Sequence, residues 1–144
     1  MNKLSIVIDA SVAAKWLLAD EEDLIASCIK KDFAKRSISV AVPAFIFYEI
    51  NNLLRSAVLS KRLSVDRAVN LYEAFLDLDF TVYWSKQLLK MTLQRAIEVN
   101  ISSYDAGYVV LAEILQIPLY TANGKLIKKA STKLVLPLND YPHI

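Results

Sequence analysis

Short apolar runs rich in β-branched residues alternate along this chain with longer stretches in which apolar residues recur at helical spacing. The first run, Leu4 to Ile8, stops at Asp9, as expected for a strand that is buried on both faces of a parallel sheet. Strands that alternate with helical stretches are typical of β-α-β units. The sequence therefore predicts an α/β fold with a mainly parallel central sheet.

The expected elements follow from these runs and from the residues that begin or end helices. The acidic cluster 20–23 suits the first turn of a helix that continues to Lys35. Pro43 is placed where a helix running to about Leu59 would begin. Serine residues are expected to cap three further helices. The expected strands cover residues 4–8, 38–42, 80–84, 117–120 and 133–136, and the capping residues are Ser64, Ser85 and either Ser102 or Ser103.

Length and composition limit both the domain count and the chemistry. The chain has 144 residues, the size of one domain, and its two glycines and four prolines form no linker. We therefore expect a single domain over residues 1–144. One cysteine and one histidine exclude a zinc finger, an iron–sulfur cluster and the usual Cys–His or Ser–His–Asp catalytic sets. With two glycines, neither the dinucleotide-binding nor the P-loop glycine pattern is present.

Charge and hydropathy bear on partners and location. A net charge of +2 predicts neither strong nucleic-acid binding nor an acidic partner. No uninterrupted apolar run approaches the roughly 18 residues of a membrane helix. The apolar start of the chain is similar to a signal peptide, but Asp9 interrupts it. We therefore expect a protein of the cytoplasm.

Four polar side chains stand where predicted strands end or predicted helices begin: Asp9, Glu49, Asp105 and Asn123. Ligands of open α/β sheets bind outside the carboxyl ends of the strands, so such positions are candidates for a site. Asp9 is equally suited to cap the helix that begins near Ala10, and Asn123 to cap the short helix that follows it. The position of these residues alone does not separate a site from a cap.

Glu49 and Asp105 carry the same ambiguity. Glu49 and Asn52 lie on one helix face, which is either solvated or part of a site. Apolar residues flank Glu49 and favour a sheltered position, where a carboxylate needs a partner or a metal. Asp105 lies in the first turn of its helix, where the helix dipole favours an anion. Gly107 in the same helix indicates that a packed neighbour or a ligand approaches the backbone closely.

Four sequence blocks that contain these residues resemble, in order, the PIN-domain ribonucleases, and especially the VapC-type toxins. The resemblance spans nearly the whole chain. It implies a three-layer α/β/α fold with a sheet of four to five strands, and a metal-dependent endoribonuclease that cleaves single-stranded or looped RNA. The blocks are 7–12, 48–55, 103–112 and 120–126, with the sequences VIDASV, YEINNLLR, SYDAGYVVLA and YTANGKL.

The resemblance also implies a cofactor, Mg²⁺ or Mn²⁺, with Asp9, Glu49 and Asp105 as its carboxylate ligands. Hard divalent cations take oxygen ligands, and a cation offsets the repulsion between neighbouring carboxylates. Asn123 stands where the family more often carries a fourth acidic residue, and it is counted with the catalytic residues. Because an amide oxygen brings no charge, we expect one well-held ion and weak affinity for a second.

Further residues are expected to line the site. Ser11 and Thr121 resemble the hydroxyl residues of the family's site, and each is equally suited to cap a helix. Asn52 is expected beside Glu49, and Lys125 heads a basic helix face that either contacts RNA phosphates or is merely solvated. Four aromatic residues are expected in the core, although a ring at the rim of the site would stack on an unpaired base: Trp16, Tyr48, Tyr104 and Tyr108.

The resemblance implies two protein partners, a second copy in a homodimer and a small antitoxin with a segment that occludes the acidic groove. A competing interpretation is a PIN-like fold that no longer cleaves and binds RNA or protein without a metal, and Asn123 keeps it open. A phosphoaspartate protein would also place an aspartate after the first strand. Asp9-Ala10-Ser11 lacks the second nearby carboxylate that such a phosphatase carries, which argues against this interpretation.

Overall fold

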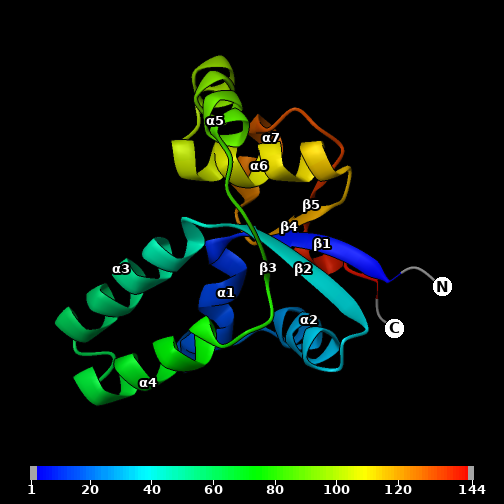
Figure 1. Ribbon diagram of the computed structural model, residues 1–144. Helices are drawn as coiled ribbons and strands as arrows, with labels where there is room; N and C mark the ends of the chain where they lie inside the picture. The colour runs from blue at the N-terminus through cyan, green and yellow to red at the C-terminus, as the bar shows by residue number, and fades with distance from the viewer. Residues whose placement is uncertain (1–2, 143–144) are drawn as a thin grey trace.

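A computed structural model describes residues 3–142 of the chain, and at its centre lies a sheet of five strands that are all parallel. The spatial order is β3-β2-β1-β4-β5 (Figure 1). The strands are β1 Leu4–Ile8, β2 Ile38–Pro43, β3 Thr81–Tyr83, β4 Leu119–Thr121 and β5 Val135–Pro137. All five expected strands are present, and the expectation of a parallel α/β sheet is confirmed.

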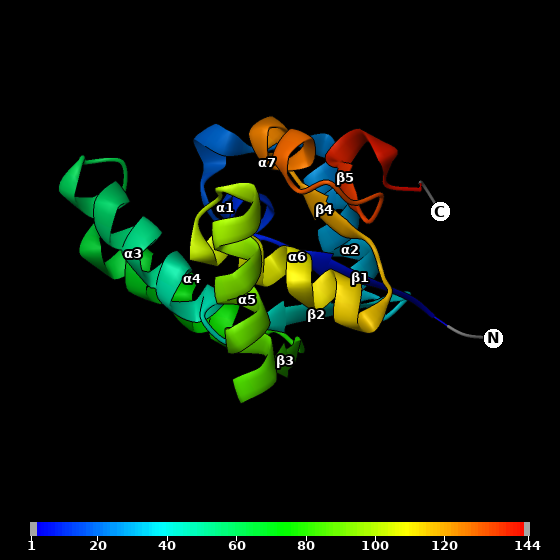
Figure 2. The same ribbon diagram turned by 90° about the horizontal axis from the view of Figure 1, so that it is seen from above.

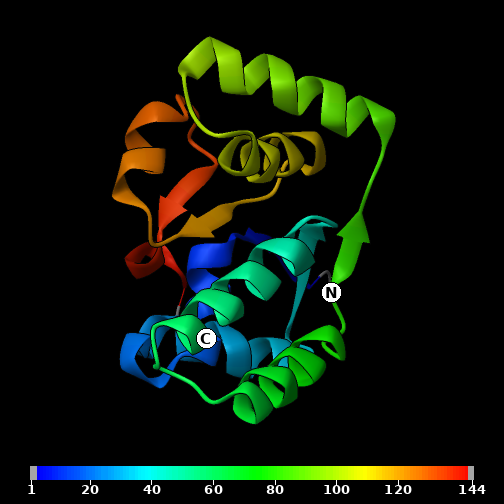
Figure 3. The same ribbon diagram turned by 90° about the vertical axis from the view of Figure 1, so that its left-hand side faces the viewer.

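Helices cover both faces of this sheet and make the fold three-layered (Figures 1 and 3). One layer contains α1 Ala10–Leu17, η1 Ala19–Glu21, α2 Leu24–Ala34, α3 Ile46–Leu59 and α4 Val65–Leu76. The other contains α5 Lys86–Val99, α6 Ser103–Leu115 and α7 Gly124–Lys129, and η2 Leu138–Asp140 follows β5. Seen from above, α5 crosses α6, which lies between α5 and the sheet (Figure 2). Among residues 3–142, no helix has the length and apolar character that a membrane crossing requires.

The core forms where the sequence pattern placed it. Ile6, Val7 and Ile8 of β1 are fully buried because helices lie on both faces of the sheet. The expected serine caps are present, since the hydroxyls of Ser64 and Ser85 accept hydrogen bonds from backbone N–H groups of α4 and α5. Of the two alternatives for α6, Ser102 is the cap.

Two helix starts differ from expectation. Residues 20–23 do not form the first turn of α2, because Asp23 is its N-cap and accepts hydrogen bonds from the N–H groups of Ile25 and Ala26 at 2.9 Å. Pro43 ends β2 rather than opening a helix. The Ala44 N–H still donates to the carbonyl oxygen of Tyr83 at 3.0 Å, so strand pairing continues past Pro43 and α3 begins only at Ile46.

The strand order contains one switch point. From β1 the chain moves through β2 to β3 on one side, and it later returns to place β4 and β5 on the other side. Ile8 of β1 is in register with Tyr120 of β4, so Asp9 and Thr121 are neighbours at the carboxyl edge of the sheet. Crevices at such switch points are where open α/β sheets bind their ligands.

Candidate active site

Asp9 lies at the carboxyl edge of the sheet, between β1 and β4. Its Oδ1 accepts hydrogen bonds from the Ser11 N–H at 3.1 Å, the Ser11 hydroxyl at 2.5 Å and the Val12 N–H at 3.3 Å, so Asp9 is the N-cap of α1. The other oxygen, Oδ2, accepts a hydrogen bond from the Thr121 hydroxyl. Asp9 therefore both caps α1 and lies at the switch point of the sheet.

Ser11 in the first turn of α1 and Thr121 at the end of β4 hold this carboxylate. The Ser11 hydroxyl oxygen also accepts the Ala122 N–H at 3.0 Å, and the Thr121 hydroxyl oxygen accepts the Asn123 N–H at 3.0 Å. Asp9 is 3% exposed and Thr121 is 1% exposed. Burial raises the pKa of Asp9; hydrogen bonds from Ser11 and Thr121 oppose this rise, and the negative charge of Asp105 adds to it.

Glu49 approaches Asp9 and Asp105 from the first turn of α3 closely enough for their charges to affect its carboxyl. Its Oε1 accepts a hydrogen bond of 2.5 Å from the hydroxyl of Tyr108, a buried residue of α6. Burial raises the pKa of Glu49 to about 7, and the charges of Asp9 and Asp105 add to the rise while the Tyr108 hydrogen bond opposes it. Glu49 is thus sheltered, as its apolar flanks predicted.

Asp105 completes the group from the first turn of α6. It is half-buried, and burial raises the pKa of its carboxyl as well. The charge of Asp105 also raises the pKa values of Asp9 and Glu49, so the three carboxylates share one electrostatic environment. They come from three separate helix starts, and the fold brings them together although they are spread over about 100 residues of sequence.

The donor set suits a hard divalent cation that keeps part of its water. Within residues 3–142, no lysine or arginine forms a salt bridge with Asp9, Glu49 or Asp105. In the same part of the chain, no three Asp, Glu, His or Cys side chains are close enough to surround an ion directly. Mg²⁺ is usually held by one or two carboxylates and several waters, so a hydrated ion would need only some of these side chains to bind it directly.

Comparison with known proteins gives the family. No family model matches the chain. Over 121 residues, 83% of this chain and 86% of the relative, it is 33% identical to Ribonuclease VapC1 of Mycobacterium tuberculosis, in strains CDC 1551 / Oshkosh and ATCC 25618 / H37Rv. The chain belongs to the VapC family of PIN-domain ribonucleases.

Solved structures show that the VapC fold is retained here. PAE2754 from Pyrobaculum aerophilum aligns with a TM-score of 0.67 at 23% identity, over 96% of this chain and 93% of that one. VapBC2 from Rickettsia felis, in a structure bound to a DNA fragment from the promoter, aligns with a TM-score of 0.69 at 13% identity. The alignment covers 93% of this chain and 98% of that one. The three-layer fold with a parallel sheet expected from the resemblance is therefore confirmed.

Asn123, the position at which this VapC-family chain departs from the expected acidic residue, has a clear local role. Its Oδ1 accepts hydrogen bonds from the N–H groups of Lys125 and Leu126 at 3.1 and 3.3 Å, so it caps α7. Asn123, Asp105 and Lys125 also line a shared hollow of about 210 Å³. The amide is therefore near the acidic group, with its oxygen already engaged by backbone donors.

The other expected residues of the VapC-type site differ in placement. Asn52 is exposed one turn beyond Glu49 on α3. Tyr48 and Tyr104 are not core residues, because they are 81% and 54% exposed. Each tyrosine directly precedes a carboxylate of the site in the sequence and lies on a helix turn that is open to solvent. The spacing of apolar residues does not predict this exposure.

Tyr108 is the residue whose role in the site the sequence did not disclose. It lies in the apolar stripe of α6 and is buried as expected, but its hydroxyl reaches Glu49, 59 positions away in the sequence. Asp105 and Tyr108 are three residues apart and therefore share a helix face. This spacing is the signal that would have connected Tyr108 with the site.

Proposed function

We propose that this chain is a metal-dependent endoribonuclease, using Mg²⁺ or Mn²⁺, and the toxin of a toxin–antitoxin pair. The observation that carries the proposal is the convergence of Asp9, Glu49 and Asp105 at the switch point of the sheet. Burial raises the pKa of all three carboxyls, and repulsion from neighbouring carboxylates adds to the rise for Asp9 and Glu49. The relative at 33% identity is named a ribonuclease, which supports the reaction class. A divalent cation would stabilise all three carboxylates in their charged form.

The three carboxylates would hold the ion, and this chain's other residues would position them. A bound divalent ion supplies a more acidic water for attack on a phosphodiester and offsets charge on the leaving oxygen. Ser11 and Thr121 keep Asp9 in one orientation through its two oxygens. Asn123 supports the site by capping α7 and by lining the hollow beside Asp105.

RNA contact would come from side chains at the rim. Lys125 lines the hollow beside Asp105 and is exposed, so it can neutralise a phosphate next to the scissile one. The exposed rings of Tyr48 and Tyr104 offer faces on which unpaired bases stack. Asn52 adds a polar group on the same side of α3 as Glu49.

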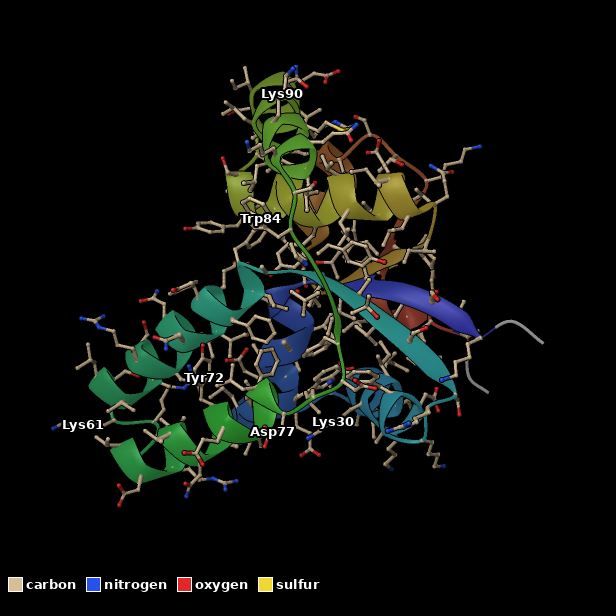
Figure 4. All side chains as sticks on the ribbon, viewed as in Figure 1. Lys30, Lys61, Tyr72, Asp77, Trp84 and Lys90 are labelled. Atoms are coloured by element: carbon tan, nitrogen blue, oxygen red, sulfur yellow. The ribbon has the colours of Figure 1, made fainter. Side chains whose placement is uncertain are left out.

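Protein partners would use the apolar surfaces that the fold leaves open. A small antitoxin would occlude the acidic group with one segment. A groove of about 320 Å³ between α3 and α4, lined mainly by aliphatic side chains, suits a further apolar part of the same partner. Figure 4 shows Tyr72 between these two helices and Trp84 on the segment that leads into α5. Leu89, Leu93 and Ile97 form an exposed stripe along α5, which suits the homodimer. We place the pair in the cytoplasm.

The test is cleavage of an end-labelled, partly looped RNA by the purified protein in Mn²⁺, compared with Asp9→Asn. Asparagine is as good an N-cap as aspartate, so this variant should keep α1 while it loses the charge. Cleavage that requires Mn²⁺ and disappears in Asp9→Asn is the expected result. Equal cleavage by both proteins would contradict the acidic site.

The second candidate function is a non-cleaving PIN-like module, and the engagement of Asn123 in a cap favours it. Thermal melting with and without Mn²⁺ separates the two functions, because an ion that binds only the folded state raises the melting temperature. A rise in the parent protein that is absent from Asp9→Asn supports the nuclease. No rise at millimolar Mn²⁺, together with no cleavage, supports the module.

A further inference from the structure

We propose that Tyr108 is a positioning residue for Glu49, which it holds in the orientation needed to bind the divalent cation. The proposal rests on the proposed function, because it assigns a role toward that ion. The main observation behind it is the 2.5 Å hydrogen bond that the Tyr108 hydroxyl donates to Glu49 Oε1. Among residues 3–142, no other side chain or backbone group forms a hydrogen bond with the Glu49 carboxylate.

The ring of Tyr108 is fixed before its hydroxyl reaches Glu49. Tyr108 is 1% exposed and packs edge-on against Phe45, with ring centroids 5.3 Å apart. Phe45 in turn lies against the bare backbone of Gly107, where an added Cβ would be 2.4 Å from its Cζ. Phe45 is the residue directly before α3, the helix that carries Glu49. Its ring therefore connects the start of α3 with α6.

The hydrogen bond ties the two halves of the acidic group together. Asp105 and Tyr108 share a face of α6, whereas Glu49 belongs to α3 on the opposite side of the sheet. A bond between Tyr108 and Glu49 therefore limits how far Glu49 can move from Asp105. It also occupies Oε1, whereas Oε2 has no hydrogen-bond donor among residues 3–142 and is available to a cation. Carboxylates that bind metals are commonly held by such hydrogen bonds.

The test is Tyr108→Phe, which keeps the ring and removes only the hydroxyl. Calorimetric titration of the RNA-free protein with Mn²⁺ should show affinity reduced about 10-fold or more, the usual effect of losing such a partner. The matched control is Tyr141→Phe, because the Tyr141 hydroxyl also donates to a carboxylate, Asp32 Oδ2 at 2.6 Å, from an equally buried ring away from the site. Tyr141→Phe should bind Mn²⁺ as the parent does.

A double-mutant cycle distinguishes positioning from general support of the fold. In a Glu49→Ala background, Tyr108→Phe should not weaken Mn²⁺ binding further, since the residue through which it acts is gone. An additional loss of the same size in that background would overturn the proposal. So would a folded Tyr108→Phe protein that binds Mn²⁺ within twofold of the parent, and that result would leave the proposed function intact.

A measurement on the unaltered protein covers the case in which Tyr108→Phe does not fold. With ¹³C at the ζ-carbon of its tyrosines, the Tyr108 resonance should move on addition of Mg²⁺, whereas that of Tyr141 should not. A stationary Tyr108 resonance in protein that binds the ion would overturn the positioning role alone. A parent protein that binds neither Mg²⁺ nor Mn²⁺ would overturn this role together with the proposed metal dependence.

Discussion

The ring of Phe45 fills the space in which a side chain on Gly107 would begin. A Cβ at Gly107 would lie 2.4 Å from Cζ and 2.6 Å from Cε1 of Phe45, well inside contact distance. The glycine inside α6 is therefore explained by a packed neighbour, one of the two alternatives that the sequence left open. The contact also seats the ring that supports Tyr108.

Gly107→Ala should destabilise the protein by about 1–3 kcal/mol, because overpacking outweighs the better helix propensity of alanine. The matched control is Gly124→Ala in the first turn of α7, where nothing lies within 4 Å of an added Cβ. That variant should be as stable as the parent or slightly more stable. Urea denaturation measures both changes, and equal stabilities for the two variants would contradict the packing argument.

Thr121→Val should destabilise the protein while it keeps the shape of the side chain. It removes the only hydrogen bond to Asp9 Oδ2 among the described residues, and it also removes the acceptor of the Asn123 N–H. A buried carboxylate oxygen without a donor costs about 1–3 kcal/mol. Thr92→Val is the control, since the Thr92 hydroxyl is buried without a partner within residues 3–142 and its loss should be neutral or stabilising. Denaturant midpoints at pH 7 compare the two, and a greater loss for Thr92→Val would refute this account of Asp9.

The sequence predicts those site residues that directly follow a strand, and Asp9 is the example. Leu4 to Ile8 reads as a buried strand from its composition, and a parallel sheet then places Asp9 at the edge where ligands bind. Capping by Ser64, Ser85 and Ser102 is equally local, because a cap bonds to N–H groups two or three residues away.

The rest depends on contacts between distant segments. Nothing in the local pattern around Glu49 identifies Tyr108 as its partner, since the pairing arises only when the fold brings one side chain of α3 and one of α6 together. The start of α3 at Ile46 rather than at Pro43 also depends on a distant segment. The Ala44 N–H donates to Tyr83 of the neighbouring strand, so the chain is still paired with the sheet at that point. The exposure of Tyr48 likewise follows from how α3 is placed against the sheet, which helical spacing does not specify.

The ion-free protein should lose stability as pH rises through the range in which Glu49 ionises. The folded-state pKa of Glu49 is about 7, above its ordinary value of 4.5, so between these values the folded state binds more protons than the unfolded state. Its contribution is therefore fully present below about pH 4.5 and is lost by about pH 7. After allowance for solvent around this partly exposed group, we expect a loss of about 1–2 kcal/mol.

Glu49→Gln removes this titration and should flatten the pH dependence of the melting temperature in EDTA between pH 4.5 and pH 7. At pH 7.5 the ion-free variant should therefore melt above the ion-free parent. Adding Mn²⁺ should stabilise the parent but have much less effect on Glu49→Gln, which has lost one of the charged ligands that we propose. A steeper pH dependence in the variant than in the parent would show that burial and the neighbouring charges do not raise the pKa of Glu49 in the folded state.

Lys125→Ala should weaken RNA binding uniformly across sequences, because a lysine that faces a phosphate carries no base information. Lys125 lines the hollow beside Asp105, whereas the exposed Lys30 of α2 lies on the opposite side of the sheet (Figure 4) and serves as the control of equal charge. Binding is measured by fluorescence anisotropy at several salt concentrations, in EDTA so that cleavage is prevented. The slope of the logarithm of the binding constant against the logarithm of the salt concentration should be about one unit shallower for Lys125→Ala. Because Lys30→Ala removes the same charge from a distant surface, equal losses for the two variants would mean that Lys125 acts through net charge and has no contact with the RNA.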